Sequence, residues 1–179
     1  SNIEVVSNLR NLMSLIIDYC PQINDLSALR ELHRLTELSV KNAMVKDIES
    51  IGGLNSLTSL TIDNAPVLSS FAPLSNLTTL EFLYAAGCDG VAEIDALQSL
   101  INLRKLSIGG AGLEDLTPLR GLVKLVSLWL IDCGRITDFT FIGGLAALEE
   151  LSLRGCWQLS DLAPLAELTD LRALDLSYC

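Results

Sequence analysis

A nine-residue pattern, L-x-x-L-x-L-x-x-C, returns along the whole chain and is clearest at positions 125–133. The leucine at its fourth position recurs eight times, at Leu15, Leu38, Leu60, Leu83, Leu106, Leu128, Leu151 and Leu174. Successive copies are 22 or 23 residues apart. Such a period indicates a stack of similar units, because a unit of this size cannot bury its hydrophobic face alone.

In the first part of each copy, hydrophobic residues occupy every second position. This alternation predicts a short β-strand with one buried face. In the copy at 125–133, Leu128 and Leu130 point inward, while Trp129 and Ile131 point outward. After the strand, hydrophobic residues recur at every third position. This spacing favours 3₁₀ turns, in which residues i and i+3 eclipse. Clear examples are Leu26, Leu29, Leu32, Leu35 and Leu38, and Leu162, Leu165, Leu168, Leu171 and Leu174.

An acidic residue precedes most of these period-three runs. The positions are Asp25, Asp47, Glu93, Asp115, Asp138 and Asp161, and Ser70 takes the place in one copy. Asp and Ser side chains accept hydrogen bonds from the free backbone N–H groups that open a helical turn. We therefore predict a structural role for these residues in preference to a ladder of metal ligands. Pro73, Pro118 and Pro164 lie near the start of such turns, where proline forfeits no hydrogen bond.

The repeats resemble those of the leucine-rich-repeat family along essentially the whole chain, residues 1–179. The short period, with Asp-Leu-x-x-Leu after the strand, is similar to internalins and to the phosphatase-regulatory subfamily. The segments 132–139 and 155–162 also resemble the Cys-x-x-Ile-Thr-Asp signature of F-box substrate receptors. The resemblance implies an α/β solenoid, a horseshoe or right-handed arc of about eight coils. Its parallel β-sheet would line the concave face, and 3₁₀ or irregular turns would cover the convex face.

Composition excludes several classes of function. The net charge is −10, so the clustered Lys and Arg that nucleic-acid binding needs are missing. Every apolar run is interrupted well before the ~20 residues of a membrane span. No nucleophile motif or phosphate-binding glycine loop is present, and His33 is the one histidine. We therefore predict no enzyme activity, no catalytic residue, no cofactor and no metal site.

Five cysteines occupy the last position of the pattern, as Cys20, Cys88, Cys133, Cys156 and Cys179, and Ala43, Ala65 and Ala111 take it in the other copies. Adjacent strands lie about 4.8 Å apart, so these residues should form a column inside the solenoid. In such a column the Cα–Cβ bonds of neighbouring cysteines run parallel and do not point toward each other, which disfavours a disulfide. We expect buried free thiols, which favour a reducing compartment and a cytoplasmic location.

Large outward residues gather on two strands of the expected concave face. Phe82 and Tyr84 face outward from one copy, and Trp129 and Ile131 from another. Ser107 lies between them, and the cations that flank the group are Lys105 and Arg154. Tyr84 and Trp129 should stand roughly 10 Å apart and wall a shallow groove. Because exposed aromatic groups mark interfaces, we predict that these seven residues bind a protein or peptide. The alternative is that the aromatics cover the sheet and pack on each other.

The function predicted from these features is a non-catalytic protein-binding module. A substrate receptor of a ubiquitin ligase and an internalin-like adhesin are the alternatives that the resemblance implies. The chain starts within a period-three run and stops directly after a strand, and neither end carries a polar cap of the kind that terminal repeats use. We therefore expect a fragment of a longer solenoid, in which the uncapped ends could associate end to end.

Overall fold

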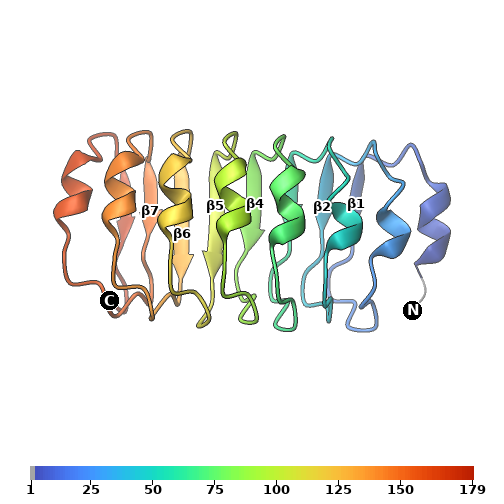
Figure 1. The fold of residues 1–179 in the computed structure, drawn as a ribbon, viewed down its shortest axis with the longest axis horizontal. Coiled ribbons are helices and arrows are strands. Elements are labelled where there is room, and N and C mark those ends of the chain that lie inside the picture. The colour runs from blue at the N-terminus through green and yellow to red at the C-terminus, as the bar shows by residue number, and fades with distance from the viewer. Residues whose placement is uncertain (1–2) are drawn as a thin grey trace.

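The computed structural model describes residues 3–179 as one open sheet of eight parallel strands in chain order (Figure 1). The strands are β1 (Ser14–Ile16), β2 (Glu37–Ser39), β3 (Ser59–Thr61), β4 (Phe82–Ala85), β5 (Lys105–Gly109), β6 (Ser127–Ile131), β7 (Glu150–Ser152) and β8 (Ala173–Asp175). The repeated leucines pair directly from strand to strand, beginning with Leu15 and Leu38 and ending with Leu151 and Leu174. The repeat period therefore sets the register of the sheet.

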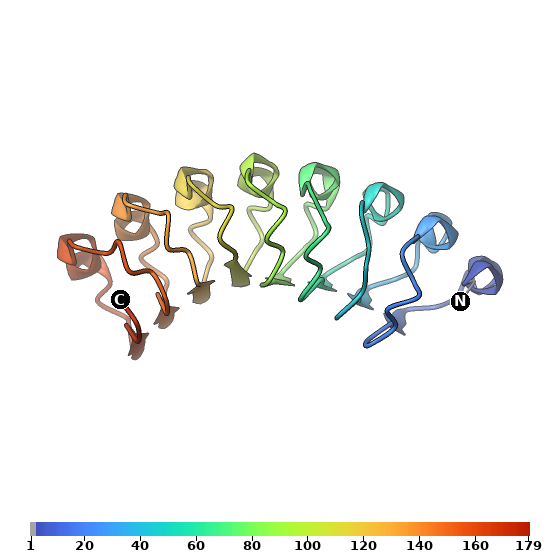
Figure 2. The same cartoon turned by 90° about the horizontal axis from the view of Figure 1, so that it is seen from below.

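One 3₁₀ helix accompanies each strand. The helices are η1 (Glu4–Asn8), η2 (Ser27–Leu29), η3 (Glu49–Ile51), η4 (Ala72–Asn76), η5 (Asp95–Ser99), η6 (Thr117–Gly121), η7 (Thr140–Gly144) and η8 (Ala163–Glu167). Figure 2 shows an arc with the strands on its inner, concave side and the helices on its outer side. The predicted solenoid of eight coils is thus confirmed.

A ladder of i to i+3 hydrogen bonds explains the period of three. The backbone N–H of Leu29 donates to the carbonyl of Leu26, that of Leu32 to Leu29, and that of Leu35 to Leu32, at 2.9 to 3.0 Å. All four leucines are buried. Every third side chain faces the core because 3₁₀ geometry has three residues per turn.

The acidic residues before these helices act on the backbone. Asp25 accepts a hydrogen bond of 2.7 Å from the N–H of Ser27, and Ser70 accepts one of 3.0 Å from the N–H of Ala72. Asp47, Asp115, Asp138 and Asp161 accept equivalent bonds. The backbone donor holds the pKa of Asp25 below its usual value. These contacts confirm the predicted structural role for the five aspartates and Ser70, whereas Glu93 makes no such bond within residues 3–179.

Burial follows the position of a coil in the stack. The Leu128 side chain is fully buried, whereas its equivalent Leu174 in the last coil is 46% exposed. All five cysteines are free thiols. Cys88, Cys133 and Cys156 are buried, as expected, whereas Cys20 is half-buried and Cys179 exposed, since the first and last coils each have a neighbour on one side only. The cytoplasmic location inferred from these thiols stays a prediction.

A left-handed residue ends every strand segment, and the sequence pattern did not reveal it. The residue four positions after the repeated leucine has positive φ in each coil, as Tyr19, Asn42, Asn64, Gly87, Gly110, Asp132, Gly155 and Tyr178. Gly, Asn and Asp tolerate this conformation best. The expectation for Ala111 was wrong: Ala111 is exposed, and the buried Gly110 precedes it. The N–H of Leu113 donates to Gly110, as that of Ile136 does to Cys133, so the shorter turn shifts the inward position by one residue.

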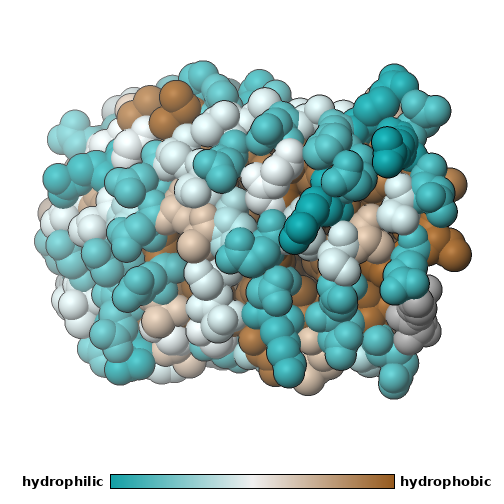
Figure 3. All heavy atoms as spheres, turned by 45° about the vertical axis from the view of Figure 1, so that its right-hand side comes forward, coloured by the Kyte–Doolittle hydropathy of each residue, from teal (hydrophilic) through white to brown (hydrophobic). Residues whose placement is uncertain are grey.

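Hydrophobic residues are exposed at the N-terminal end. Figure 3 brings this end forward and shows hydrophobic surface among hydrophilic side chains there. Val5 is 74% exposed, Leu9 51% and Met13 54%. End-to-end association through such surfaces stays a prediction.

Candidate functional site

An aromatic pair crosses the middle of the concave face. Tyr84, Ser107 and Trp129 occupy one register row on β4, β5 and β6. The Tyr84 and Trp129 rings stack with centroids 6.2 Å apart and planes inclined by 25°. Ser107 between them is only 8% exposed. The expected open groove is therefore absent, because both side chains lean across the small serine and pack on each other.

The other predicted residues surround this pair. Phe82 and Ile131 are partly buried and lie on the same strands as Tyr84 and Trp129. Lys105 is paired in register with Phe82 on one side and with the buried Ser127 on the other. Arg154 is exposed, and its guanidinium lies 5.4 Å from the ring centroid of Tyr178. The predicted residues other than Ser107 thus share one accessible face, and their assignment to a partner stays a prediction.

A hollow opens on the other side of Trp129, above β7 and β8. Trp129, Ser152 and Asp175 form one register row, in which Trp129 and Asp175 line the hollow and the short Ser152 lies between them. Glu150 on β7 and Ala173 on β8 also line it. Of the residues that line the hollow, only Trp129 is among the predicted site residues. Small neighbours beside a large aromatic residue were the signal that could have found the hollow.

The carboxylate of Asp175 is held in place by serines. It accepts hydrogen bonds from the Ser152 hydroxyl at 3.1 Å and from the Ser177 N–H at 2.9 Å. Hydrogen bonds from Ser177, with a smaller contribution from Ser152 and from the charge of Arg154, hold the pKa of Asp175 below its usual value. Asp175 is therefore charged at neutral pH.

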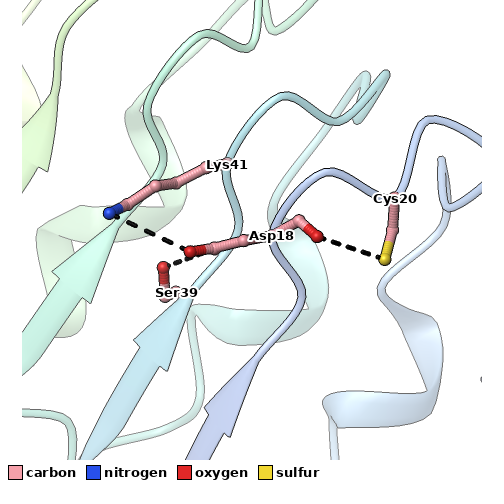
Figure 4. Close-up of polar contacts among 4 residues, drawn as sticks. All are labelled: Asp18, Cys20, Ser39 and Lys41. Atoms are coloured by element: carbon pink, nitrogen blue, oxygen red, sulfur yellow. Dashed lines mark hydrogen bonds and ion pairs between the residues drawn. The ribbon is translucent and has the colours of Figure 1, made fainter.

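At the N-terminal end of the concave face, the charged groups pair with one another. Asp18 accepts a hydrogen bond of 2.7 Å from the Ser39 hydroxyl and lies 3.9 Å from the Lys41 ammonium group (Figure 4). Asp63 accepts a bond of 3.1 Å from the N–H of Ala86. Burial raises the pKa of Asp63, and this backbone bond opposes the shift. This region offers less unpaired charge to a ligand than the surface above β5 to β8.

Residues 3–179 hold neither a candidate metal site nor a candidate membrane-spanning helix. This part of the chain holds no group of three or more His, Cys, Asp or Glu side chains that could bind a metal ion. None of its helices has the length and hydrophobicity needed to cross a membrane. His33 is exposed and lies 3.8 Å from Glu31, as expected for a surface residue.

Comparison with solved structures decides the family. Internalin C2 of Listeria monocytogenes is 34% identical, with a TM-score of 0.82, and the alignment covers 94% of this chain and 73% of that one. The chain belongs to the leucine-rich-repeat family. No family model and no curated protein sequence matches it.

Two further leucine-rich-repeat neighbours have the same fold. An internalin (inlF) of Listeria monocytogenes is 28% identical with a TM-score of 0.89, over 99% of this chain and 51% of that one. The present leucine-rich-repeat chain therefore spans about half the length of that internalin. The leucine-rich repeat domain of the type III effector XopL is 22% identical with a TM-score of 0.68, over 95% of this chain and 70% of that one. At this identity the likeness concerns the fold alone.

Proposed function

We propose that this leucine-rich-repeat protein binds a protein or peptide through its concave face, with Tyr84 and Trp129 at the centre of the contact. The family and its neighbours support a protein-interaction module in general. No cofactor and no catalytic residue enters the proposal.

The observation that carries the proposal is the aromatic pair itself. Most other outward positions on the strands are small or polar, and several serines among them are buried. Tyr84 and Trp129 remain partly exposed although they stack on each other. Large aromatic side chains with few rotatable bonds contribute much of the affinity at protein interfaces. Phe82 and Ile131 extend this surface along the same two strands.

Two cations would orient the partner. Lys105 and Arg154 lie on opposite sides of Trp129, on β5 and just after β7. Lys105 makes no ion pair with any residue of the described chain, so a partner carboxylate can reach it without breaking an existing contact. Such peripheral charges act mainly on orientation and association rate.

A selection from a random peptide library displayed on phage, with the immobilised protein as bait, tests the proposal. Selected peptides should bind Trp129→Ala and Tyr84→Ala at least about tenfold more weakly, which is the effect of a moderate interface residue. Val123→Ala is the matched control, because Val123 is 58% exposed in the turn before β6. Unchanged affinity for folded Trp129→Ala and Tyr84→Ala would exclude this site.

An internalin-like adhesin is the more specific role that the comparisons favour over a ubiquitin-ligase receptor. The observation in its support is the 34% identity to internalin C2. The purified protein should then bind intact mammalian cells, and Trp129→Ala should reduce that binding while Val123→Ala should not. Absence of cell binding by the folded wild type would count against the adhesin and leave the peptide-binding proposal standing.

A further inference from the structure

We infer that the hollow between Trp129 and Asp175 receives an arginine side chain of the bound partner. The inference rests on the proposed function and names the chemistry that one part of the concave face recognises.

The spacing of the hollow suits a flat cationic group. Trp129 and Asp175 lie in the same register row on strands two apart, so their backbones are separated by roughly 10 Å. Ser152 between them is 8% exposed and too short to fill the space. One wall is thus an indole ring and the other is a carboxylate. A guanidinium can stack on an aromatic face and donate paired hydrogen bonds to a carboxylate at the same time.

The charges around the hollow favour a cation. Asp175 is held in position by Ser152 and Ser177, so its carboxylate is oriented before a ligand arrives. Glu150 is exposed, and its side chain makes no ion pair or hydrogen bond with another residue of the described chain. Ala173, which is paired in register with Glu150, leaves the approach to the hollow open. The net charge of −10 also attracts basic segments from solution.

The protein's own arginines leave room for this ligand. Arg154 lies over the ring of Tyr178, with its guanidinium carbon 5.4 Å from the ring centroid. Arg172 pairs with Glu149 at 3.0 Å. Two cations therefore lie near the carboxylates of Glu150 and Asp175. Arg154 acts on Asp175 but is shared with the ring of Tyr178. Lys105 is two strands from Glu150 in the same register row and makes no ion pair with it.

The experiment uses a capped Gly-Arg-Gly peptide and its citrulline twin, which keeps the planar shape and loses the charge. In a Trp157→Phe background, Trp129 is the single tryptophan, so its indole N–H resonance reports binding in an NMR titration. The arginine peptide should shift this resonance in a saturable way. The citrulline peptide should bind at least about fivefold more weakly, as should the arginine peptide to Glu150→Gln/Asp175→Asn.

Glu167→Gln on η8 is the matched control for loss of a negative charge, because it lies on the convex side. This variant should leave the titration unchanged, and a loss equal to that of Glu150→Gln/Asp175→Asn would mean non-specific attraction and overturn the inference. Equal shifts with arginine and citrulline would also overturn it. If library peptides still require Trp129 while the arginine peptide causes no shift, the inference fails and the proposed function stands. If library peptides bind without Trp129, the proposed function itself fails.

Discussion

Tyr84 and Trp129 lie on strands separated by a third, and their rings nevertheless stack with centroids 6.2 Å apart. The contact passes above Ser107, whose side chain is too short to separate them. The pair therefore couples coils four and six directly, in addition to the backbone bonds through coil five. A partner that binds here meets side chains that are already ordered.

The stacked rings should contribute to stability as a unit. A double-mutant cycle with Tyr84→Ala and Trp129→Ala should give a coupling free energy of about 0.5–1.5 kcal/mol, the range for aromatic pairs. Urea unfolding of the wild type, both single variants and the double variant measures it. Strictly additive losses would show that the rings contribute only separate burial.

Leu128 should be more important for stability than its equivalent at the C-terminal end. Leu128→Ala should lower the free energy of unfolding by about 2–5 kcal/mol, because the side chain is fully buried. Leu174→Ala removes the same atoms from a side chain that is 46% exposed, so the loss should be clearly smaller. Thermal and denaturant unfolding measure both, and equal losses would contradict the burial found for the last coil.

Gly109 should not tolerate a side chain. A Cβ atom at this position would overlap the backbone carbonyl oxygen of Ile131 on the next strand. Gly109→Ala should therefore cost about 1–3 kcal/mol or more, as overpacking does. Gly121→Ala is the control, since a Cβ atom there meets nothing within 4 Å. A stable Gly109→Ala with unchanged spectra would show that the two strands separate more easily than the structure indicates.

Tyr19 occupies a left-handed position that suits asparagine better. Its φ is 56° and its side chain is 77% exposed, so little packing offsets the steric cost. Tyr19→Asn should raise the free energy of unfolding by about 1 kcal/mol. The reverse change at an equivalent position, Asn64→Tyr, should lower it. A higher melting temperature for Asn64→Tyr than for the wild type would refute the explanation.

The half-buried Asp63 should make stability depend on pH. Burial raises the pKa of Asp63 in the folded state, so the charged form is less favourable there than in the unfolded chain. This carboxyl therefore lowers stability as pH rises through its folded pKa. Asp63→Asn should raise the melting temperature at about pH 7 and have little effect at about pH 3, where the wild-type carboxyl is protonated. Thermal unfolding of the wild type and Asp63→Asn at both pH values measures this, and an equal difference in melting temperature at the two would contradict the explanation.

Much of the fold follows from spacing alone. The two-residue alternation placed Leu128 and Leu130 inward and Trp129 outward, and the structure agrees. The period of three favoured 3₁₀ turns, which the i to i+3 bonds confirm. Both predictions succeeded because the same hydrophobic pattern occurs eight times, so a deviation in one copy does not hide it.

The candidate site was harder to predict because it depends on side-chain directions and on gaps between particular residues. The strand spacing predicted a gap of roughly 10 Å between Tyr84 and Trp129. It could not show that both rings would lean over Ser107. The hollow beside Trp129 exists because Ser152 and Ala173 are small, which is a property of two single positions. Likewise, Gly110 takes the inward position expected for Ala111 because one turn is a residue shorter, which is a local feature of that coil.

The backbone of each coil in the described chain contacts only the coils before and after it. The contact between Tyr84 and Trp129 is an exception, since it bypasses one coil. Bending that moves coil four away from coil six would have to separate these two rings as well as strain the backbone bonds between the strands. The middle of the arc should for this reason resist bending more strongly than its two ends.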